Sequence, residues 1–155
     1  MILTKIGQLK NLGLSPDDFV RSQLFDAEEP YDLANEYVYR QYQEKLRFYN
    51  AIDFDDLLFL TVKLFQETPG IAEKYSGKYQ FIMVDEYQDT NPPQFELIRY
   101  LTTTHKNLCV VGDDDQSIYG FRGANVENIL NFEKHFSGAK VVKLEQNYRS
   151  TKPIL

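Results

Sequence analysis

Three clusters of polar residues each follow a short apolar run, and they contain the side chains best suited to chemistry. The clusters, each given with the run before it, are residues 85–89 after 80–84, 112–116 after 108–111, and 145–149 after 140–144. The first cluster begins with two neighbouring carboxylates, Asp85 and Glu86. One carboxylate can help to hold a magnesium ion, while its neighbour can orient and deprotonate a water molecule. An isolated pair of this kind is more often a solvated acidic turn, so its context decides the reading.

The spacing of the apolar runs predicts the elements that position these clusters. Residues 80–84, 108–111 and 140–144 have the length of buried strands, and helical segments over 92–103 and 126–136 separate them. Alternating strands and helices favour an α/β fold, with a parallel sheet and crossover helices. Because ligands of open parallel sheets bind beyond the carboxyl ends of the strands, we expect the three clusters to converge on one edge.

The N-terminal part of the chain reads as helical. The segment Ser15–Asp18 combines an N-cap serine, a proline at the first helical position and an acidic third residue, which predicts a short helix through Leu24. A longer helix is predicted from about Tyr31 to Tyr49, where apolar residues recur mostly at three- and four-residue spacing. Another helix should cover Phe54–Gln66, and the sequence Thr68-Pro69-Gly70 should end it.

Composition narrows the class of protein. The 155 residues are 43% hydrophobic, enough for one globular domain, and the net charge of -6 lacks the basic footprint of an independent DNA-binding domain. No apolar run reaches membrane-spanning length and the N-terminus does not resemble a signal peptide, so we expect a cytoplasmic protein without a membrane partner. The single cysteine, Cys109, can form no disulfide within the chain and is expected to be a small buried hydrophobic residue.

Three longer strings containing the polar clusters resemble one known family. The strings Val84–Asn91, Gly112–Ala124 and Leu144–Ser150 are similar, in this order, to motifs of the UvrD/Rep/PcrA family of superfamily 1 DNA helicases. The string Asp53–Leu58 also resembles that family, at the point where its chain re-enters the first motor domain after a helical insertion. The resemblance extends from about Ser15 to the end of the chain, more loosely over the early helices.

The resemblance implies a role for each residue that matches a nucleotide-site motif. Asp85 would coordinate magnesium, Glu86 would be the catalytic carboxylate, and Gln116 would sense the γ-phosphate of ATP. Arg149 would also reach the γ-phosphate, where a planar cation suits the charge of the transferring phosphoryl group. Tyr148 would stack on the adenine.

The same resemblance implies a DNA contact a few residues after Gln116. Tyr119, Phe121 and Arg122 would lie on the DNA side, which would join hydrolysis to movement along the strand. From composition alone, Tyr119 and Phe121 would be core aromatics, because the chain has 11 tyrosines and 11 phenylalanines and most of them must pack. The family commonly has tryptophan at position 121, and phenylalanine offers a smaller stacking face.

One element of the family pattern is absent from these 155 residues. They contain no Gly-x-x-x-x-Gly-Lys-Ser/Thr string, which forms the phosphate loop of such motors. We therefore expect a partial RecA-like P-loop NTPase motor domain. Residues 1–50 would be a remnant of a helical subdomain, residues 51–145 the back portion of the first motor domain, and residues 146–155 a crossover towards a second motor domain.

This interpretation makes the chain a fragment that is inactive by itself. The intact parent would use ATP and Mg²⁺ to move along single-stranded DNA and to unwind duplex DNA, with the remaining domains of the helicase as further partners. Two other hypotheses stay open. One is a non-catalytic module that keeps the shape of the motor to bind DNA, nucleotide or a partner protein. The other is a metal-dependent phosphohydrolase or nuclease built on Asp85, Glu86 and Asp89, which would need further ligands.

Overall fold

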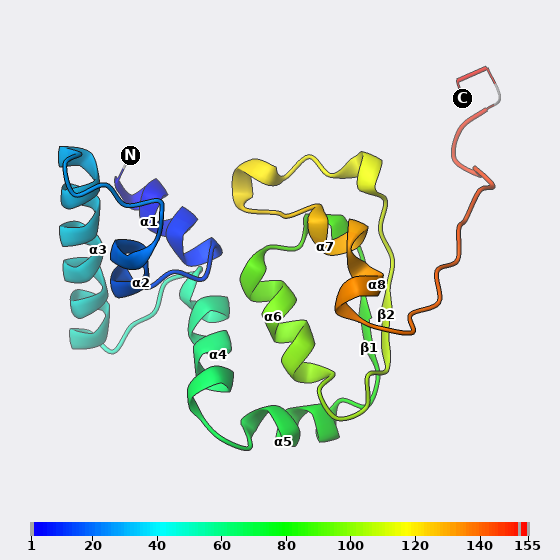
Figure 1. The fold of residues 1–155 in the computed structure, drawn as a ribbon, viewed down its shortest axis with the longest axis horizontal. Coiled ribbons are helices and arrows are strands. Elements are labelled where there is room, and N and C mark those ends of the chain that lie inside the picture. Colours follow the sequence, from blue (N-terminus) through cyan, green and yellow to red (C-terminus); the bar gives the residue numbers. More distant parts are fainter. Residues whose placement is uncertain (1, 152, 155) are drawn as a thin grey trace.

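The computed structural model describes residues 2–151, 153 and 154, and it begins with three helices around one apolar core (Figure 1). These helices are α1 (Ile2–Asn11), α2 (Pro16–Arg21) and α3 (Pro30–Phe48). Their buried core consists of Ile6, Leu9, Phe19 and Tyr39. The predicted helical character of this part is confirmed, and α3 lies within one residue of the predicted bounds.

The helix start predicted at Ser15 is present as a capping box. The Ser15 hydroxyl accepts a hydrogen bond from the Asp18 amide, and the Asp18 carboxylate accepts one from the Ser15 amide. Hydrogen bonding from Ser15 holds the pKa of Asp18 below its usual value. The helix ends at Arg21 rather than at Leu24, and the amide of the next residue, Ser22, bonds back to Phe19.

Three more helices follow this unit along the chain. They are α4 (Asp56–Glu67), α5 (Ile71–Lys78) and α6 (Pro92–Leu101). Phe65 of α4 lies between Tyr75 of α5 and Tyr100 of α6, with ring centroids 5.6 Å apart in both pairs. The sequence did not predict helix α5, because Thr68-Pro69-Gly70 indicated only the end of the preceding helix. In the structure Gly70 adopts φ 82° and starts the next helix.

The sheet consists of two parallel strands joined by α6. Strands β1 (Ile82–Val84) and β2 (Leu108–Val110) pair so that Ile82 lies opposite Leu108. Two short helices, α7 (Glu127–Leu130) and α8 (Phe132–His135), lie with α6 on the covered side of the strands (Figure 1). The core on that side contains Tyr87, Phe95 and Ile98. The α/β fold and the parallel pairing are therefore confirmed.

Two predictions about the strands are wrong. Residues 140–144 pair with no strand in the part of the chain that the structure describes; Val141 is 60% exposed and Leu144 is 86% exposed. Without a partner for its backbone groups, this β-type sequence stays extended. Cys109 is exposed rather than buried, because it lies beside Met83 on the face of the sheet that no described helix covers. Within the described residues, no helix is both long and apolar enough to cross a membrane.

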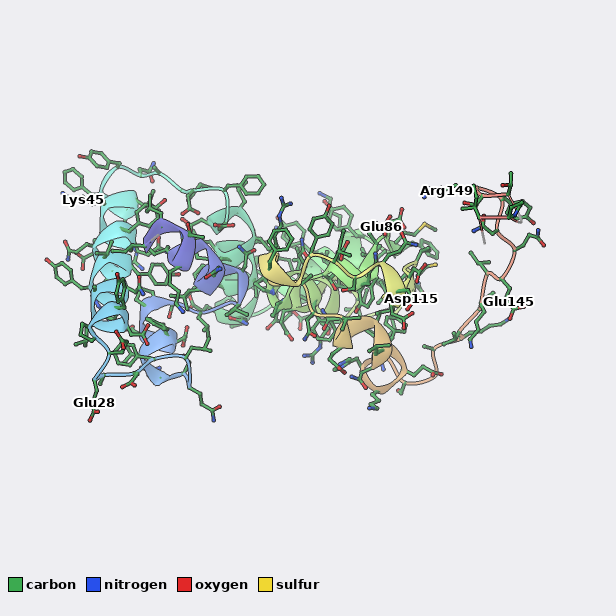
Figure 2. The ribbon with its side chains drawn as sticks, turned by 90° about the horizontal axis from the view of Figure 1, so that it is seen from above. Glu28, Lys45, Glu86, Asp115, Glu145 and Arg149 are labelled. Atoms are coloured by element: carbon green, nitrogen blue, oxygen red, sulfur yellow. The ribbon has the colours of Figure 1, made fainter. Side chains whose placement is uncertain are left out.

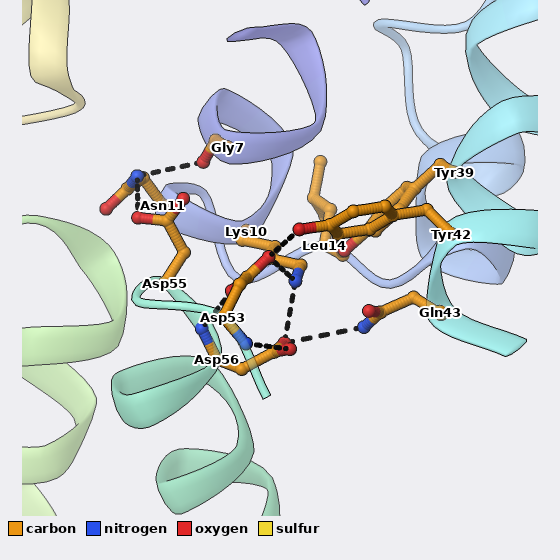
Figure 3. Close-up of polar contacts among 10 residues, drawn as sticks. All are labelled: Gly7, Lys10, Asn11, Leu14, Tyr39, Tyr42, Gln43, Asp53, Asp55 and Asp56. Atoms are coloured by element: carbon orange, nitrogen blue, oxygen red, sulfur yellow. Dashed lines mark hydrogen bonds and ion pairs between the residues drawn. The ribbon is translucent and has the colours of Figure 1, made fainter. Parts of the chain in front are cut away.

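A buried ion cluster joins the N-terminal unit to the start of α4 (Figure 3). The fully buried Lys10 ammonium lies 2.6 Å from Asp53 Oδ2 and 2.8 Å from Asp56 Oδ1. Tyr42 donates a hydrogen bond of 2.9 Å to Asp53, and its ring lies 5.2 Å from the ammonium. Although burial by itself raises the pKa of Asp53, hydrogen bonds from Lys10, the Asp56 amide and Tyr42 hold that pKa below its usual value. The cluster therefore favours the ionised form of Asp53 and fixes α1 against α4.

We predict that Lys10→Met lowers the free energy of unfolding of the 155-residue chain by roughly 3–5 kcal/mol, because two carboxylates then stay in the cluster without their cation. Chemical denaturation measures the loss. The control is Lys45→Met at an exposed position of α3, for which we expect a change within about 0.5 kcal/mol. Equal stabilities of the two variants would show that the cluster does not hold the helices together.

Candidate functional site

Two of the three polar clusters meet at the carboxyl end of the sheet. The pairing of the chains continues past the strands, because the Val111 amide donates to the Val84 carbonyl over 2.8 Å. The Tyr87 amide then donates to the Val111 carbonyl over 3.0 Å. Residues 85–89 and 112–116 therefore start side by side, which confirms the predicted convergence for these two clusters.

Asp85 and Glu86 lie in the turn directly after β1, and both are exposed. Glu86 has φ 51° and ψ 43°, a left-handed conformation that costs a residue with a side chain roughly 1–2 kcal/mol. The turn is held by the Glu86 amide, which donates to Asp85 Oδ1 over 2.9 Å, and by the Asp89 amide, which donates to the Glu86 carbonyl over 2.9 Å. Strain of this kind persists only where the surroundings enforce it. Asn50 and Lys106 also have a positive φ, but of the three only Glu86 lies in the turn directly beyond the carboxyl end of a strand, which makes Glu86 a candidate functional residue.

The turn continues as a 3₁₀ helix, η1 (Tyr87–Asp89), which is anchored in the core. Tyr87 is fully buried and meets Phe132 edge to face, with ring centroids 5.5 Å apart. Burial raises the pKa of Tyr87 to about 12, so its hydroxyl stays neutral at physiological pH. Because Tyr87 cannot move without opening the core, the backbone on both sides of it is fixed.

The second cluster forms a turn that holds Gln116. It contains the 3₁₀ helix η2 (Asp114–Gln116), and Asp113 caps it by accepting a hydrogen bond from the Asp115 amide over 3.1 Å. The other Asp113 carboxylate oxygen accepts a hydrogen bond of 2.7 Å from Gln116 Nε2. Gln116 is exposed, so its side chain is available to a ligand beyond the strand ends.

Tyr119, Phe121 and Arg122 lie together on an exposed loop that includes the 3₁₀ helix η3 (Gly120–Arg122). The two rings have centroids 5.9 Å apart, and the guanidinium carbon of Arg122 lies 5.2 Å from the Tyr119 ring and 5.4 Å from the Phe121 ring. Phe121 is 70% exposed, and neither ring belongs to a buried core cluster. The core interpretation of these two aromatics is therefore wrong, and the loop presents a cation and two aromatic faces to solvent.

Tyr148 and Arg149 are not brought to the other predicted site residues. Both are exposed, and the segment that carries them extends away from the helices and the sheet (Figure 1). In Figure 2 Arg149 lies on this extension, well separated from Glu86 and Asp115. Their predicted contacts with nucleotide therefore stay predictions.

The donor set after β1 fits a magnesium ion held together with a phosphate ligand. Mg²⁺ takes oxygen ligands and commonly binds through one or two carboxylates, with waters and substrate phosphates completing its octahedron. Asp85 and Glu86 supply carboxylate oxygens on an exposed turn that leaves room for such partners. Among residues 2–151, 153 and 154, no three His, Cys, Asp or Glu side chains are grouped as a metal site made by protein alone.

Sequence reasoning gave no role to Gln88 and Gly112. Gln88 is 1% exposed, and its side chain bridges the turns after β1 and β2. Gly112 lies against that side chain: a Cβ at this position would be 2.6 Å from Gln88 Oε1, 2.8 Å from the Ile129 methyl and 3.2 Å from the Tyr87 amide nitrogen. A glycine directly after the apolar run 108–111 is the signal in the sequence for such a close approach.

We predict that Gly112→Ala destabilises the 155-residue chain by roughly 1–3 kcal/mol, as expected when an atom is forced into packed surroundings. The control is Gly77→Ala in α5, where a Cβ meets no atom within 4 Å. That change should stabilise the chain by roughly 0.4–1 kcal/mol, since it removes freedom from the unfolded state. Thermal unfolding of both variants tests the contrast, and a neutral Gly112→Ala would contradict the close contact.

Known proteins are similar in sequence to this chain over nearly its whole length. The profile of the UvrD/REP helicase N-terminal domain matches residues 1–137. A probable DNA helicase II homolog of Rickettsia felis is 50% identical over 150 residues, which cover 97% of this chain and 22% of that protein. The ATP-dependent DNA helicase PcrA of Staphylococcus epidermidis is 48% identical over 155 residues, which cover 100% of this chain and 21% of that protein.

A third relative agrees with these two. The DNA helicase II of Rickettsia typhi is 49% identical over 150 residues, covering 97% of this chain and 22% of its own length. The chain thus spans about a fifth of the length of the curated relatives that it matches. Since the family profile covers most of the chain and the identity extends over nearly all of it, the chain belongs to the UvrD/REP helicase N-terminal domain family.

Proposed function

We propose that this chain supplies the hydrolytic carboxylates and a DNA-contacting loop to an ATP-dependent DNA helicase that moves along single-stranded DNA and unwinds duplex. The observation that carries the proposal is the strained, exposed Glu86 at the carboxyl end of β1, which hydrogen bonds through Gln88 connect to the turn that leads to Gln116. The names of the relatives, ATP-dependent DNA helicase PcrA and DNA helicase II, support the same reaction.

In this proposal each exposed polar side chain beyond the strands has one task. Asp85, with its carboxylate beside the Glu86 amide, would hold the magnesium ion, which supplies positive charge to the phosphate oxygens when it is bound. Glu86 orients the attacking water and accepts its proton. Gln116, held by Asp113, offers an amide to the γ-phosphate and so responds to its presence. Adenine stacking by Tyr148 and charge stabilisation by Arg149 require the C-terminal segment to turn back towards the sheet.

The proposed coupling to DNA follows the hydrogen bonds that anchor the aromatic loop. The Ser117 hydroxyl donates to the Gln88 carbonyl over 3.3 Å at the start of the loop. At its end the Asn125 amide donates to the Thr90 carbonyl over 2.9 Å, and Asn128 Nδ2 donates to the same carbonyl over 3.1 Å. The start of the loop is therefore attached to η1, and its end is attached to Thr90, the residue after η1. A shift of the turn after β1 would move the aromatic loop with it.

The proposal extends to the parts of the parent protein. We propose that residues 1–50 belong to a helical subdomain, residues 51–145 to a RecA-like motor domain, and residues 146–155 to a crossover towards a second motor domain. The two-stranded parallel sheet with α6 as its crossover, and polar turns beyond its carboxyl end, support the motor-domain assignment. The exposed Phe81 and Met83 on the open face of this sheet also agree with a larger domain.

The catalytic assignment is tested in a full-length ATP-dependent DNA helicase. We define the PcrA chimera as the Staphylococcus epidermidis PcrA in which this chain replaces the matching 155 residues. We predict that Glu86→Gln lowers the turnover of DNA-stimulated ATP hydrolysis by about a hundredfold or more, the usual contribution of a positioned general base, while nucleotide binding is kept. The matched control is Glu133→Gln, an exposed glutamate of α8, which should hydrolyse ATP like the parent chimera. An inactive parent chimera, or full turnover by Glu86→Gln, would contradict the proposed function.

The DNA contact is tested with Phe121→Ala in the same chimera. A stacked base contributes roughly 1–3 kcal/mol, so we predict a loss of single-strand affinity of that size, with the melting temperature unchanged because the ring is exposed. Fluorescence anisotropy with a labelled single strand measures the affinity. Phe48→Ala, at a phenylalanine of α3 that is 79% exposed, serves as the control and should bind like the parent. Equal affinities of the two variants would exclude the DNA contact.

A further inference from the structure

Gln88 is a buried polar residue, and both the nitrogen and the oxygen of its side-chain amide make a hydrogen bond. Its side-chain amide nitrogen donates a hydrogen bond of 2.8 Å to Glu86 Oε2. Its side-chain oxygen accepts one of 3.1 Å from the Asp113 amide. Burying an amide without partners costs free energy, so these two bonds explain how a residue that is only 1% exposed can be a glutamine.

The chemistry of the two partners requires a glutamine-like group between them. An ionised carboxylate such as that of Glu86 only accepts hydrogen bonds, whereas the backbone amide of Asp113 only donates one. A primary amide has a donor and an acceptor on the same carbon and can serve both at once. Leucine could fill the same space without either bond, and glutamate could keep only the bond from Asp113.

The surroundings fix this side chain in place. The flanking Tyr87 is fully buried, and the Gln88 carbonyl accepts a hydrogen bond from Ser117 over 3.3 Å. Gly112 passes so close to the side-chain oxygen that a Cβ there would lie at 2.6 Å. The amide of Gln88 therefore has little freedom to turn away from Glu86 or from Asp113.

We propose that Gln88 is a positioning residue for ATP hydrolysis. It holds the Glu86 carboxylate in its working orientation and ties it to the turn that carries the phosphate-sensing Gln116. The connection runs from Glu86 through Gln88 to the Asp113 amide, and from the Asp113 carboxylate to Gln116 over 2.7 Å. A displacement of Gln116 by the γ-phosphate would thus be transmitted to the carboxylate that orients the water. This inference rests on the proposed function and adds a residue that does not itself touch the reacting atoms.

The main test is the turnover of the PcrA chimera carrying Gln88→Leu. Removing a side chain that orients a catalytic group typically costs tenfold to a hundredfold in activity, and we expect kcat to fall by about that factor with KM for ATP within about threefold. Gln88→Glu keeps the acceptor for Asp113 but places a second carboxylate beside Glu86, so its kcat should fall at least as far. The control is Gln43→Leu in α3, which removes another buried glutamine amide, one that bonds to Asp56 rather than to Glu86, and it should keep kcat within about threefold. Melting temperatures of all variants separate lost folding from lost turnover.

A double-mutant cycle shows whether Gln88 acts through Glu86. In the Glu86→Gln background, adding Gln88→Leu should lower kcat by less than about threefold, because the carboxylate that Gln88 orients is already gone. Losses that multiply in the double variant, or a Gln88→Leu variant as active as Gln43→Leu, would overturn the inference. These outcomes leave the proposed function standing, since that function fails only if Glu86→Gln is itself fully active or the parent chimera is inactive.

Discussion

The parallel pairing of β1 with β2 is the constraint on which the candidate site depends. Because both strands run in the same direction and their backbones stay bonded as far as Val111 and Tyr87, the chain leaves both strands at the same edge. This brings a turn with two carboxylates beside a turn with an aspartate cap and a glutamine. The crossover helix α6, the buried Tyr87 and the short helices α7 and α8 fill the core beneath this edge and hold it in place. Without that pairing the two turns would be unrelated loops.

The exposed side chains of the candidate site are held in place by buried neighbours. Groups that would meet phosphate or DNA must be open to solvent in the absence of a ligand, as Asp85, Glu86, Gln116 and Phe121 are. Their orientation therefore comes from buried neighbours. Gln88 lies beneath Glu86, and Thr90 receives both Asn125 and Asn128 at the end of the aromatic loop. Lys10 is a buried group of the same kind in the N-terminal unit. It extends from α1 to Asp53 and Asp56 at the start of α4, and its charge offsets the cost of burying these two carboxylates.

Local signals in the sequence predicted the elements whose stability is itself local. The Ser15 capping box, the long α3 and the two apolar strands before acidic turns all appear where periodicity and capping placed them. The predictions that failed, and the contacts that no prediction included, concern residues whose surroundings are set by distant parts of the chain. Residues 140–144 have strand-like composition but no neighbouring strand among the described residues, and Cys109 is exposed because no described helix covers its face of the sheet. The amide of Gln88 and the ammonium of Lys10 find their partners 25 and 43 residues away, and no periodicity in one chain reveals such pairs.

We propose that the two turns beyond β1 and β2 form one nucleotide-responsive unit that includes the aromatic loop. The most direct measurement is hydrogen–deuterium exchange of the PcrA chimera, with and without a non-hydrolysable ATP analogue and Mg²⁺. We predict slower exchange over residues 85–89 and 112–122 together, because ligand contact at Glu86 or Gln116 stiffens the hydrogen bonds that join them. Protection confined to PcrA segments outside these residues, with exchange at both turns unchanged, would contradict it.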